Sequence, residues 1–133
     1  MVSTTVKLED MIFRELLQQI ILRLVQENEV ENMVKHVILW NLKDELGEAE
    51  KTEVKKGIKE GLEGLAGKIP GLVSIKVNID YLDSSNAEVM LDSTFVDEAS
   101  LKGYAVHPEH VAVADSAVRP YTKSRVCMDY IEE

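Results

Sequence analysis

Hydrophobic and polar residues recur along the chain with two different periods, and the period changes near residue 33. Over residues 7–29 the apolar side chains recur at steps of three and four, which predicts a long amphipathic helix with a wide apolar stripe. Residues 27–32 form a polar break, and from residue 33 the pattern alternates with the period of a strand. The chain therefore divides into an N-terminal helical extension, residues 1–32, and a main domain, residues 33–133.

The first strand of the main domain carries large apolar residues on both of its faces. One face holds Val34, His36, Ile38, Trp40 and Leu42, and the other holds Met33, Lys35, Val37, Leu39 and Asn41. Helices of the same domain can cover one face, but no later segment supplies a second sheet for the other. We therefore expect a homodimer through the sheet. The apolar stripe of the N-terminal helix also needs a cover, either the main domain or a second copy in a higher oligomer.

The remaining segments predict a ferredoxin-like domain. Strands are predicted over residues 72–81, 87–96 and 124–131, and helices over residues 49–68, 97–104 and 108–119. Asp97 suits an N-cap and Pro108 suits a first helical position. The last strand is expected to point Val126, Met128 and Tyr130 inward. A helix followed by the order β-α-β-β-α-β predicts an α+β fold with a four-stranded antiparallel sheet.

Three glycines lie within the helix predicted over residues 49–68. They are Gly57, Gly61 and Gly64, and each costs about 1 kcal/mol of helix stability relative to alanine. Their spacing leads us to expect close packing of this helix on the sheet.

The segment from Tyr104 to Val111 holds two of the three histidines and forms the corner between two helices. A neutral imidazole can take a proton next to a carbonyl group, and a phenol can donate a hydrogen bond to the developing enolate. The corner therefore presents a phenol and two imidazoles, from Tyr104, His107 and His110. Such side chains can also be structural, with His36 in the core, Tyr104 packed by its ring, and His107 bracing the corner.

Composition limits the classes of partner and cofactor. The net charge is −9, from 24 acidic and 15 basic residues, and the lysines of residues 51–59 alternate with glutamates, which argues against a nucleic acid partner. No apolar run reaches the roughly 18 residues that span a membrane, and we see no signal peptide, so we expect no membrane partner and a cytoplasmic location.

The sequence gives little support for a metal site or for a reactive thiol. Cys127 is the only cysteine, so an intrachain disulfide is excluded, and its place in an alternating strand predicts a buried, inert thiol. His107, Glu109 and His110 are candidate metal ligands by type, but nothing in their spacing constrains a geometry. We expect neither a metal nor an organic cofactor.

From residue 33 onward the chain resembles the stress-responsive A/B barrel family, also called the Dabb family. The matching segments are Val34–Leu39, Ile69–Gly71, Ser93–Phe95, Leu101, Tyr104, His107–Val111 and Asp129–Tyr130. The resemblance implies a dimeric α+β barrel in which two subunits pack sheet on sheet. The same architecture is shared by small monooxygenases that use no metal or flavin.

The resemblance leaves two functions open. Most members of the family have no assigned activity, which implies a small binding protein with an apolar or carbonyl ligand between sheet and helices. Ile38, Trp40 and His107 are expected to line that pocket. The alternative is a cofactor-free enzyme of the cyclase, aldol, proton-transfer or monooxygenase type.

One plant member of the family closes a linear polyketide by an aldol reaction. By position, the working residues of that enzyme correspond here to His36, Tyr104 and His110. A further tyrosine of that enzyme falls on an apolar position in this chain, at Ile58 or Leu62. The resemblance therefore implies a related pocket with a different shape.

Overall fold

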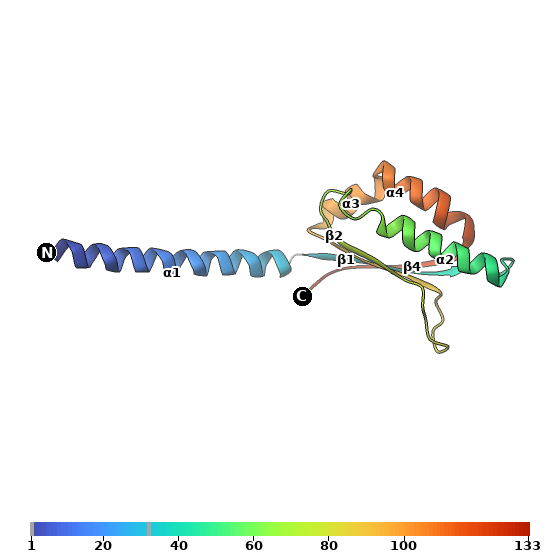
Figure 1. Ribbon diagram of the computed structural model, residues 1–133, viewed down its shortest axis with the longest axis horizontal. Helices are drawn as coiled ribbons and strands as arrows, with labels where there is room; N and C mark the ends of the chain where they lie inside the picture. Colours follow the sequence, from blue (N-terminus) through green and yellow to red (C-terminus); the bar gives the residue numbers. More distant parts are fainter. Residues whose placement is uncertain (1, 32) are drawn as a thin grey trace.

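A long N-terminal helix, α1 (Val2–Glu31), extends away from an α+β domain (Figure 1). The computed structural model describes the backbone of residues 2–31 and 33–133 and the side chains of residues 7–26 and 33–133. The domain comprises β1 (Val34–Leu42), α2 (Glu48–Glu63), β2 (Leu72–Asn78), β3 (Val89–Phe95), α3 (Glu98–Val106), α4 (Pro108–Val113) and β4 (Thr122–Ile131). A π-helical turn (Ala114–Val118) and a 3-10 turn (Arg119–Tyr121) join α4 to β4. This order confirms the predicted ferredoxin-like arrangement.

The four strands form one antiparallel sheet in the order β2-β3-β1-β4. The helices α2, α3 and α4 cover one face of this sheet, and no described element of the chain covers the other (Figure 1). We call the covered face the inner face and the other the outer face. In the β1–β4 register His36 lies opposite Asp129, and Trp40 lies opposite Arg125.

The core lies between the inner face and the helices, as the alternation of β1 predicts. Its buried members include Val34, Ile38, Trp40 and Leu42 of β1, Val89, Leu91 and Phe95 of β3, and Ile58, Leu62, Tyr104 and Val118 of the helical layer. Each such side chain contributes about 1.5–3 kcal/mol when fully buried. The inner face of β1 therefore anchors the domain and fixes where His36 lies.

The prediction that the apolar residues of β4 point inward is wrong. Val126, Met128 and Tyr130 pair with outer-face residues of β1, and their side chains are 64%, 66% and 44% exposed. Arg125, Cys127 and Asp129 take the inner face instead, and Cys127 is exposed rather than buried. The prediction failed because it assigned apolar residues to the covered face, whereas in this strand they belong to the face without a cover.

The predicted polar break at residues 27–32 does not end the N-terminal helix, which continues to Glu31, and residue 32 lies outside the described residues. Glutamate and glutamine are good helix formers, so polarity alone does not end a helix.

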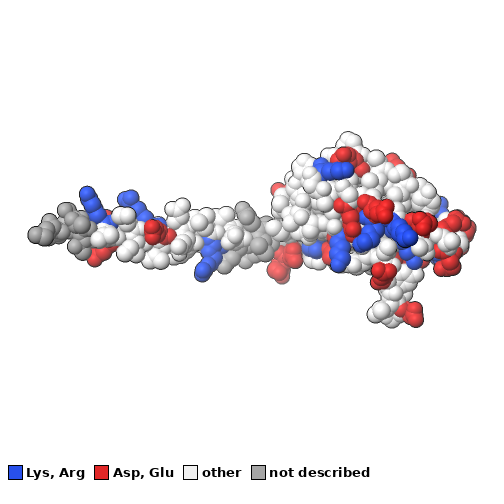
Figure 2. Space-filling view, viewed as in Figure 1, with Lys and Arg blue, Asp and Glu red and all other residues white. Residues whose placement is uncertain are grey.

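The large apolar side chains of α1, from Leu8 to Val25, are all at least 45% exposed. Figure 2 shows charges of both signs, with uncharged surface between them, along the described part of α1. No helix among the described residues is long and apolar enough to cross a membrane.

Helix α2 ends at Glu63, earlier than predicted, because Gly64 serves as its C-cap and donates its N–H to Glu60 O at 2.9 Å. Of the three glycines only Gly61 meets another element: a Cβ built there would lie 2.8 Å from Val113 Cγ1 of α4. A Cβ at Gly57 would meet nothing within 4 Å. The expected close packing therefore occurs at one glycine, against a helix rather than the sheet.

Candidate functional site

A cavity of about 140 Å³ lies between the inner face of the sheet and the helical layer, and we call it the central cavity. Five of the six residues proposed from the sequence line it: His36, Ile38, Trp40, Tyr104 and His110. Leu62, Leu91, Leu101, Ala105, Ala114, Val118, Arg119, Thr122 and Arg125 complete the lining. The structure therefore brings β1, β4 and the corner between α3 and α4 together around one small space.

The corner between α3 and α4 follows from capping chemistry. Asp97 begins α3 by accepting a hydrogen bond from the Ser100 N–H at 2.7 Å, as predicted. Pro108 occupies the first turn of α4, and the residue before it is extended. The change of direction stacks the rings of Tyr104 and His110, whose centroids are 4.0 Å apart with an interplanar angle of 34°.

His107 does not line the central cavity. It lies in a separate surface depression beside Pro70 and Asp97, and its Nδ1 accepts a hydrogen bond from the Glu109 N–H at 3.2 Å. Its imidazole therefore caps α4, which agrees with the bracing role and corrects the expectation of a pocket residue.

His36 is held by a partner from the neighbouring strand. Its Nδ1 lies 2.5 Å from Asp129 Oδ1, and the carboxylate can only accept, so Nδ1 carries the proton. Ser93 Oγ also donates to the His36 backbone carbonyl at 2.8 Å, which fixes the strand position of this residue. The result is an imidazole whose position on the wall of the cavity is fixed by Asp129.

Burial sets the protonation of Tyr104 and His110. It raises the pKa of the Tyr104 hydroxyl well above its ordinary value, so the phenol stays protonated and available as a donor. Burial, opposed by a backbone contact with Ala105 and helped by the charges of Arg119 and Arg125, lowers the pKa of His110 below 6.5, so its imidazole is neutral at physiological pH. Tyr104 Oη and His110 Nδ1 are buried and have no hydrogen-bond partner among the described residues.

Three residues of this region were not predicted from the sequence as site residues: Asp129, Arg125 and Cys127. Cys127 Sγ lies 3.7 Å from His36 Nδ1 and 3.4 Å from Asp129 Oδ1. Burial and the adjacent Asp129 raise the pKa of the Cys127 thiol, which disfavours a reactive thiolate. Only the register of β4 against β1 could have revealed these neighbours.

The candidate metal ligands also differ from those of the sequence. Among the described residues, His36, Cys127 and Asp129 offer donor atoms within 4.8 Å of one another, whereas His107, Glu109 and His110 form no such group. Zinc ligands at about 2.0–2.3 Å from the ion stand well over 3 Å apart. The 2.5 Å contact between His36 and Asp129 would have to open before an ion could bind.

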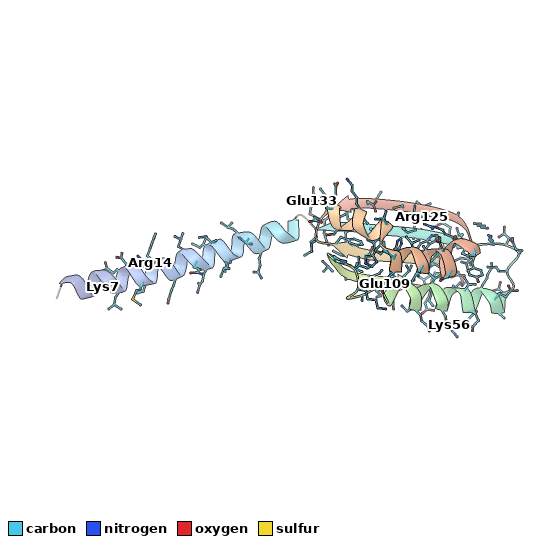
Figure 3. The ribbon with its side chains drawn as sticks, turned by 90° about the horizontal axis from the view of Figure 1, so that it is seen from above. Lys7, Arg14, Lys56, Glu109, Arg125 and Glu133 are labelled. Carbon is cyan, nitrogen blue, oxygen red and sulfur yellow. The ribbon has the colours of Figure 1, made fainter. Side chains whose placement is uncertain are left out.

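An open groove of about 680 Å³ adjoins the central cavity and shares His36, Leu101, Ala105 and Arg125 with it. It runs between α3 and β4, and Lys102, Glu98 and Asp129 also line it. Figure 3 shows β4, with Arg125, along the edge of the domain opposite to α2 with Lys56. The groove therefore offers a route from solvent to the cavity past Arg125.

A four-stranded antiparallel sheet with helices on one face and a ligand-sized cavity between them defines a ferredoxin-like α+β barrel protein. The family model for the Stress responsive A/B Barrel Domain (Dabb) matches residues 34–132, so the chain belongs to that family.

Solved structures agree with this assignment. A protein of unknown function from Bacteroides fragilis NCTC 9343, described as dimeric with a ferredoxin-like fold, is 35% identical, with a TM-score of 0.70; the match covers 74% of this chain and 95% of that one. A Dabb family protein from Mesorhizobium loti is 21% identical, with a TM-score of 0.59 and coverage of 74% and 95%. Hydroxynitrile lyase from Passiflora edulis is 17% identical, with a TM-score of 0.60 and coverage of 77% and 95%. The last two likenesses show the fold alone. A comparison with curated proteins found no match.

Proposed function

We propose that this protein binds a small carbonyl compound in the central cavity. The observation that carries the proposal is the pair of buried polar atoms, Tyr104 Oη and His110 Nδ1, that have no hydrogen-bond partner among the described residues. Such groups cost about 1–3 kcal/mol each when nothing satisfies them. A carbonyl oxygen that accepts from the Tyr104 hydroxyl would remove one of these costs.

The size of the cavity supports a small ligand. A cavity of about 150 Å³ holds a molecule such as benzene, and the central cavity measures about 140 Å³. The rest of its lining is largely apolar, with Ile38, Trp40 and Leu91 among its walls. A ligand with a few carbon atoms and one carbonyl group fits both the volume and the lining.

The test is an NMR titration of the full-length protein with a small neutral ketone, cyclopentanone. We expect saturable shifts at residues of the cavity, and we expect Tyr104→Phe to weaken binding about fivefold or more, as the loss of one hydrogen bond predicts. Tyr81→Phe is the matched control and should bind like the wild type, because Tyr81 is 45% exposed and lines neither the cavity nor the groove. Equal affinity of the Tyr104→Phe variant, or no saturable shift in the wild type, would contradict the proposal.

A second candidate function is proton transfer without a cofactor, and the His36–Asp129 pair favours it. The Asp129 carboxylate orients the His36 imidazole, and His110 is neutral, so the cavity wall carries a base beside a phenol that can stabilise an enolate. The fold is shared with a hydroxynitrile lyase, although at 17% identity. The enzyme hypothesis therefore rests on the geometry of this cavity.

Deuterium exchange distinguishes the two functions. If the cavity catalyses proton transfer, the protein in heavy water will exchange the protons next to the carbonyl of cyclopentanone faster than buffer does. His36→Ala and His110→Ala should then abolish exchange while the ketone still binds. Binding without catalysed exchange would leave the protein as a ligand-binding barrel.

We further propose that two copies pair through the outer face of the sheet, and that α1 links copies into a higher oligomer. The exposed Val126, Met128 and Tyr130 support the first contact, and the 35% identical Bacteroides protein is described as dimeric. The exposed apolar side chains of α1 support the second, since an apolar stripe of this length is stabilised by pairing. In this proposal residues 1–32 are the oligomerising extension and 33–133 the ligand-binding domain, and a cytoplasmic location stays a prediction.

A further inference from the structure

The central cavity is lined by positive charges although the protein as a whole is acidic. The net charge of the chain is −9. The described lining of the cavity nevertheless includes Arg119 and Arg125 and no aspartate or glutamate. Two guanidiniums beside one small space create a local field that favours an anion there.

Arg125 is the cation that is available to a ligand. The guanidinium of Arg119 pairs with Asp115, whereas Arg125 forms no ion pair with any carboxylate of the described residues. It lines both the central cavity and the adjoining groove, so a ligand that enters from the groove passes it. Its charge acts on both Tyr104 and His110, which places it near the groups that would hold a carbonyl.

The chemistry of arginine narrows the choice of anion. A carboxylate loses hydration when it enters a small cavity, and it needs a charged partner to compensate. The guanidinium offers two parallel N–H donors that match the two oxygens of a carboxylate. The groove carries Glu98 and Asp129 beside Lys102, so its charges are mixed and the net positive site is the cavity end.

We propose that the ligand of the central cavity is a short keto acid, whose carboxylate pairs with Arg125 and whose carbonyl oxygen accepts a hydrogen bond from the Tyr104 hydroxyl. This inference rests on the proposed carbonyl-binding function and adds the class of compound. Pyruvate has the size required, because it has as many non-hydrogen atoms as benzene, which fits a cavity of about 150 Å³.

The test compares pyruvate with pyruvamide, its neutral counterpart of nearly the same shape, in NMR titrations of the full-length protein. We expect pyruvate to bind at least about tenfold more tightly than pyruvamide, as a charge-assisted pair predicts. In Arg125→Gln this preference should fall to about twofold or less, while the affinity for pyruvamide stays unchanged. Added salt should weaken the binding of pyruvate more than that of pyruvamide.

Lys123→Gln is the matched control, because it removes one positive charge from the same strand at a residue that pairs with Asp44 and lines neither hollow. It should keep the preference for pyruvate. Equal affinity for the two compounds in the wild type, or equal effects of the two substitutions, would overturn the keto acid proposal while leaving carbonyl binding intact. If cyclopentanone binds but neither of these compounds does, the keto acid proposal fails and carbonyl binding stands; if none of the three binds, both fail.

Discussion

At the scale of single residues, the central feature is a stacked phenol and imidazole that lack hydrogen-bond partners among the described residues. Tyr104 is fully buried and packs against Phe95 and His110, with ring centroids 5.1 Å and 4.0 Å apart. The packing of these rings stabilises the core. Burial of the unpaired polar atoms of Tyr104 and His110 lowers the free energy of unfolding, and the packing does not offset that loss. Residues kept at such a cost are better explained by binding than by stability.

Removal of the Tyr104 hydroxyl should therefore not weaken the fold. We expect Tyr104→Phe to leave the free energy of unfolding unchanged or to raise it by up to about 1 kcal/mol, because the variant no longer buries an unsatisfied group. Urea unfolding followed by circular dichroism measures this, with Tyr81→Phe as the exposed control. A loss greater than about 1 kcal/mol would mean that the hydroxyl is satisfied in the free protein.

His110 should make the stability of the protein sensitive to mild acid. Burial lowers the pKa of His110 in the folded state from its ordinary 6.5. Above that pH the imidazole is neutral in both states; below it the unfolded chain takes up the proton first, so the free energy of unfolding falls as the pH falls towards the folded-state pKa.

The measurement is the free energy of unfolding at about pH 7.5 and about pH 5.5, on either side of the ordinary histidine value. His110→Gln should lose less stability on acidification than the wild type. The same slope in His110→Gln and in the wild type would show that His110 does not cause it.

At the scale of elements, the contact between α2 and α4 sets how the helical layer lies over the cavity. Gly61 of α2 faces Val113 of α4, and α4 carries His110 at the cavity wall. Gly71 allows the other close approach: its φ is +79°, and a Cβ there would lie 2.0 Å from Ser100 Oγ of α3. Both glycines thus hold the helices that position Tyr104 and His110.

Two glycines of α2 offer a matched comparison. Gly57→Ala should stabilise the protein by about 0.5–1 kcal/mol, because alanine favours the helix and its Cβ meets nothing. Gly61→Ala should be less stable than Gly57→Ala by about 1–3 kcal/mol, because its Cβ overlaps Val113. Thermal unfolding of the two variants measures the difference. Equal stabilities would show that α4 shifts away without cost.

At the scale of the whole molecule, two apolar surfaces lack a cover: the outer face of the sheet and the stripe of α1. The domain can form its core without either, since its buried side chains come from β1–β3, the helices α2 and α3, and the turns that follow α2 and α4. Both surfaces therefore serve association better than they serve the fold of one chain.

The substitution Met128→Lys should break the proposed sheet-on-sheet contact between two copies of the chain. It places a charge within the outer face, where Met128 is 66% exposed in the single chain, and a sheet-on-sheet contact would have to bury that charge. Native mass spectrometry at low protein concentration should show half the number of subunits. Val106→Lys is the control, because Val106 is 76% exposed on α3, away from the sheet. An unchanged assembly would mean that the outer face is not the interface.

Deletion of residues 1–32 should lower the oligomeric state without unfolding the domain. Helix α1 spans 30 residues, or about 45 Å, and its exposed apolar side chains are absent from the core of the domain. Light scattering should show a dimer where the full chain forms a larger assembly, with a similar melting temperature. If full-length and truncated chains have equal subunit numbers, α1 does not join copies.

The sequence by itself determined the order of the elements, the alternation of β1, and the corner that brings Tyr104 to His110. These features depend on residues close together in the chain, because periodicity, N-caps and a proline at a helix start act over one or two turns. The resemblance to the family, position by position, named the candidate residues His36, Tyr104 and His110 before their distances were known.

Only the tertiary structure decided the features that depend on partners distant in sequence. The register of β4 against β1 placed Asp129 and Arg125 beside the cavity and turned the apolar residues of β4 outward. A shift of one residue exchanges the two faces of a strand, and a strand with mixed residues on both faces does not reveal its register. His107 lies outside the cavity for a similar reason. The direction of its ring depends on the Glu109 N–H, from which its Nδ1 accepts a hydrogen bond. Local pattern thus predicted the scaffold, and cross-strand pairing determined the charge of the site.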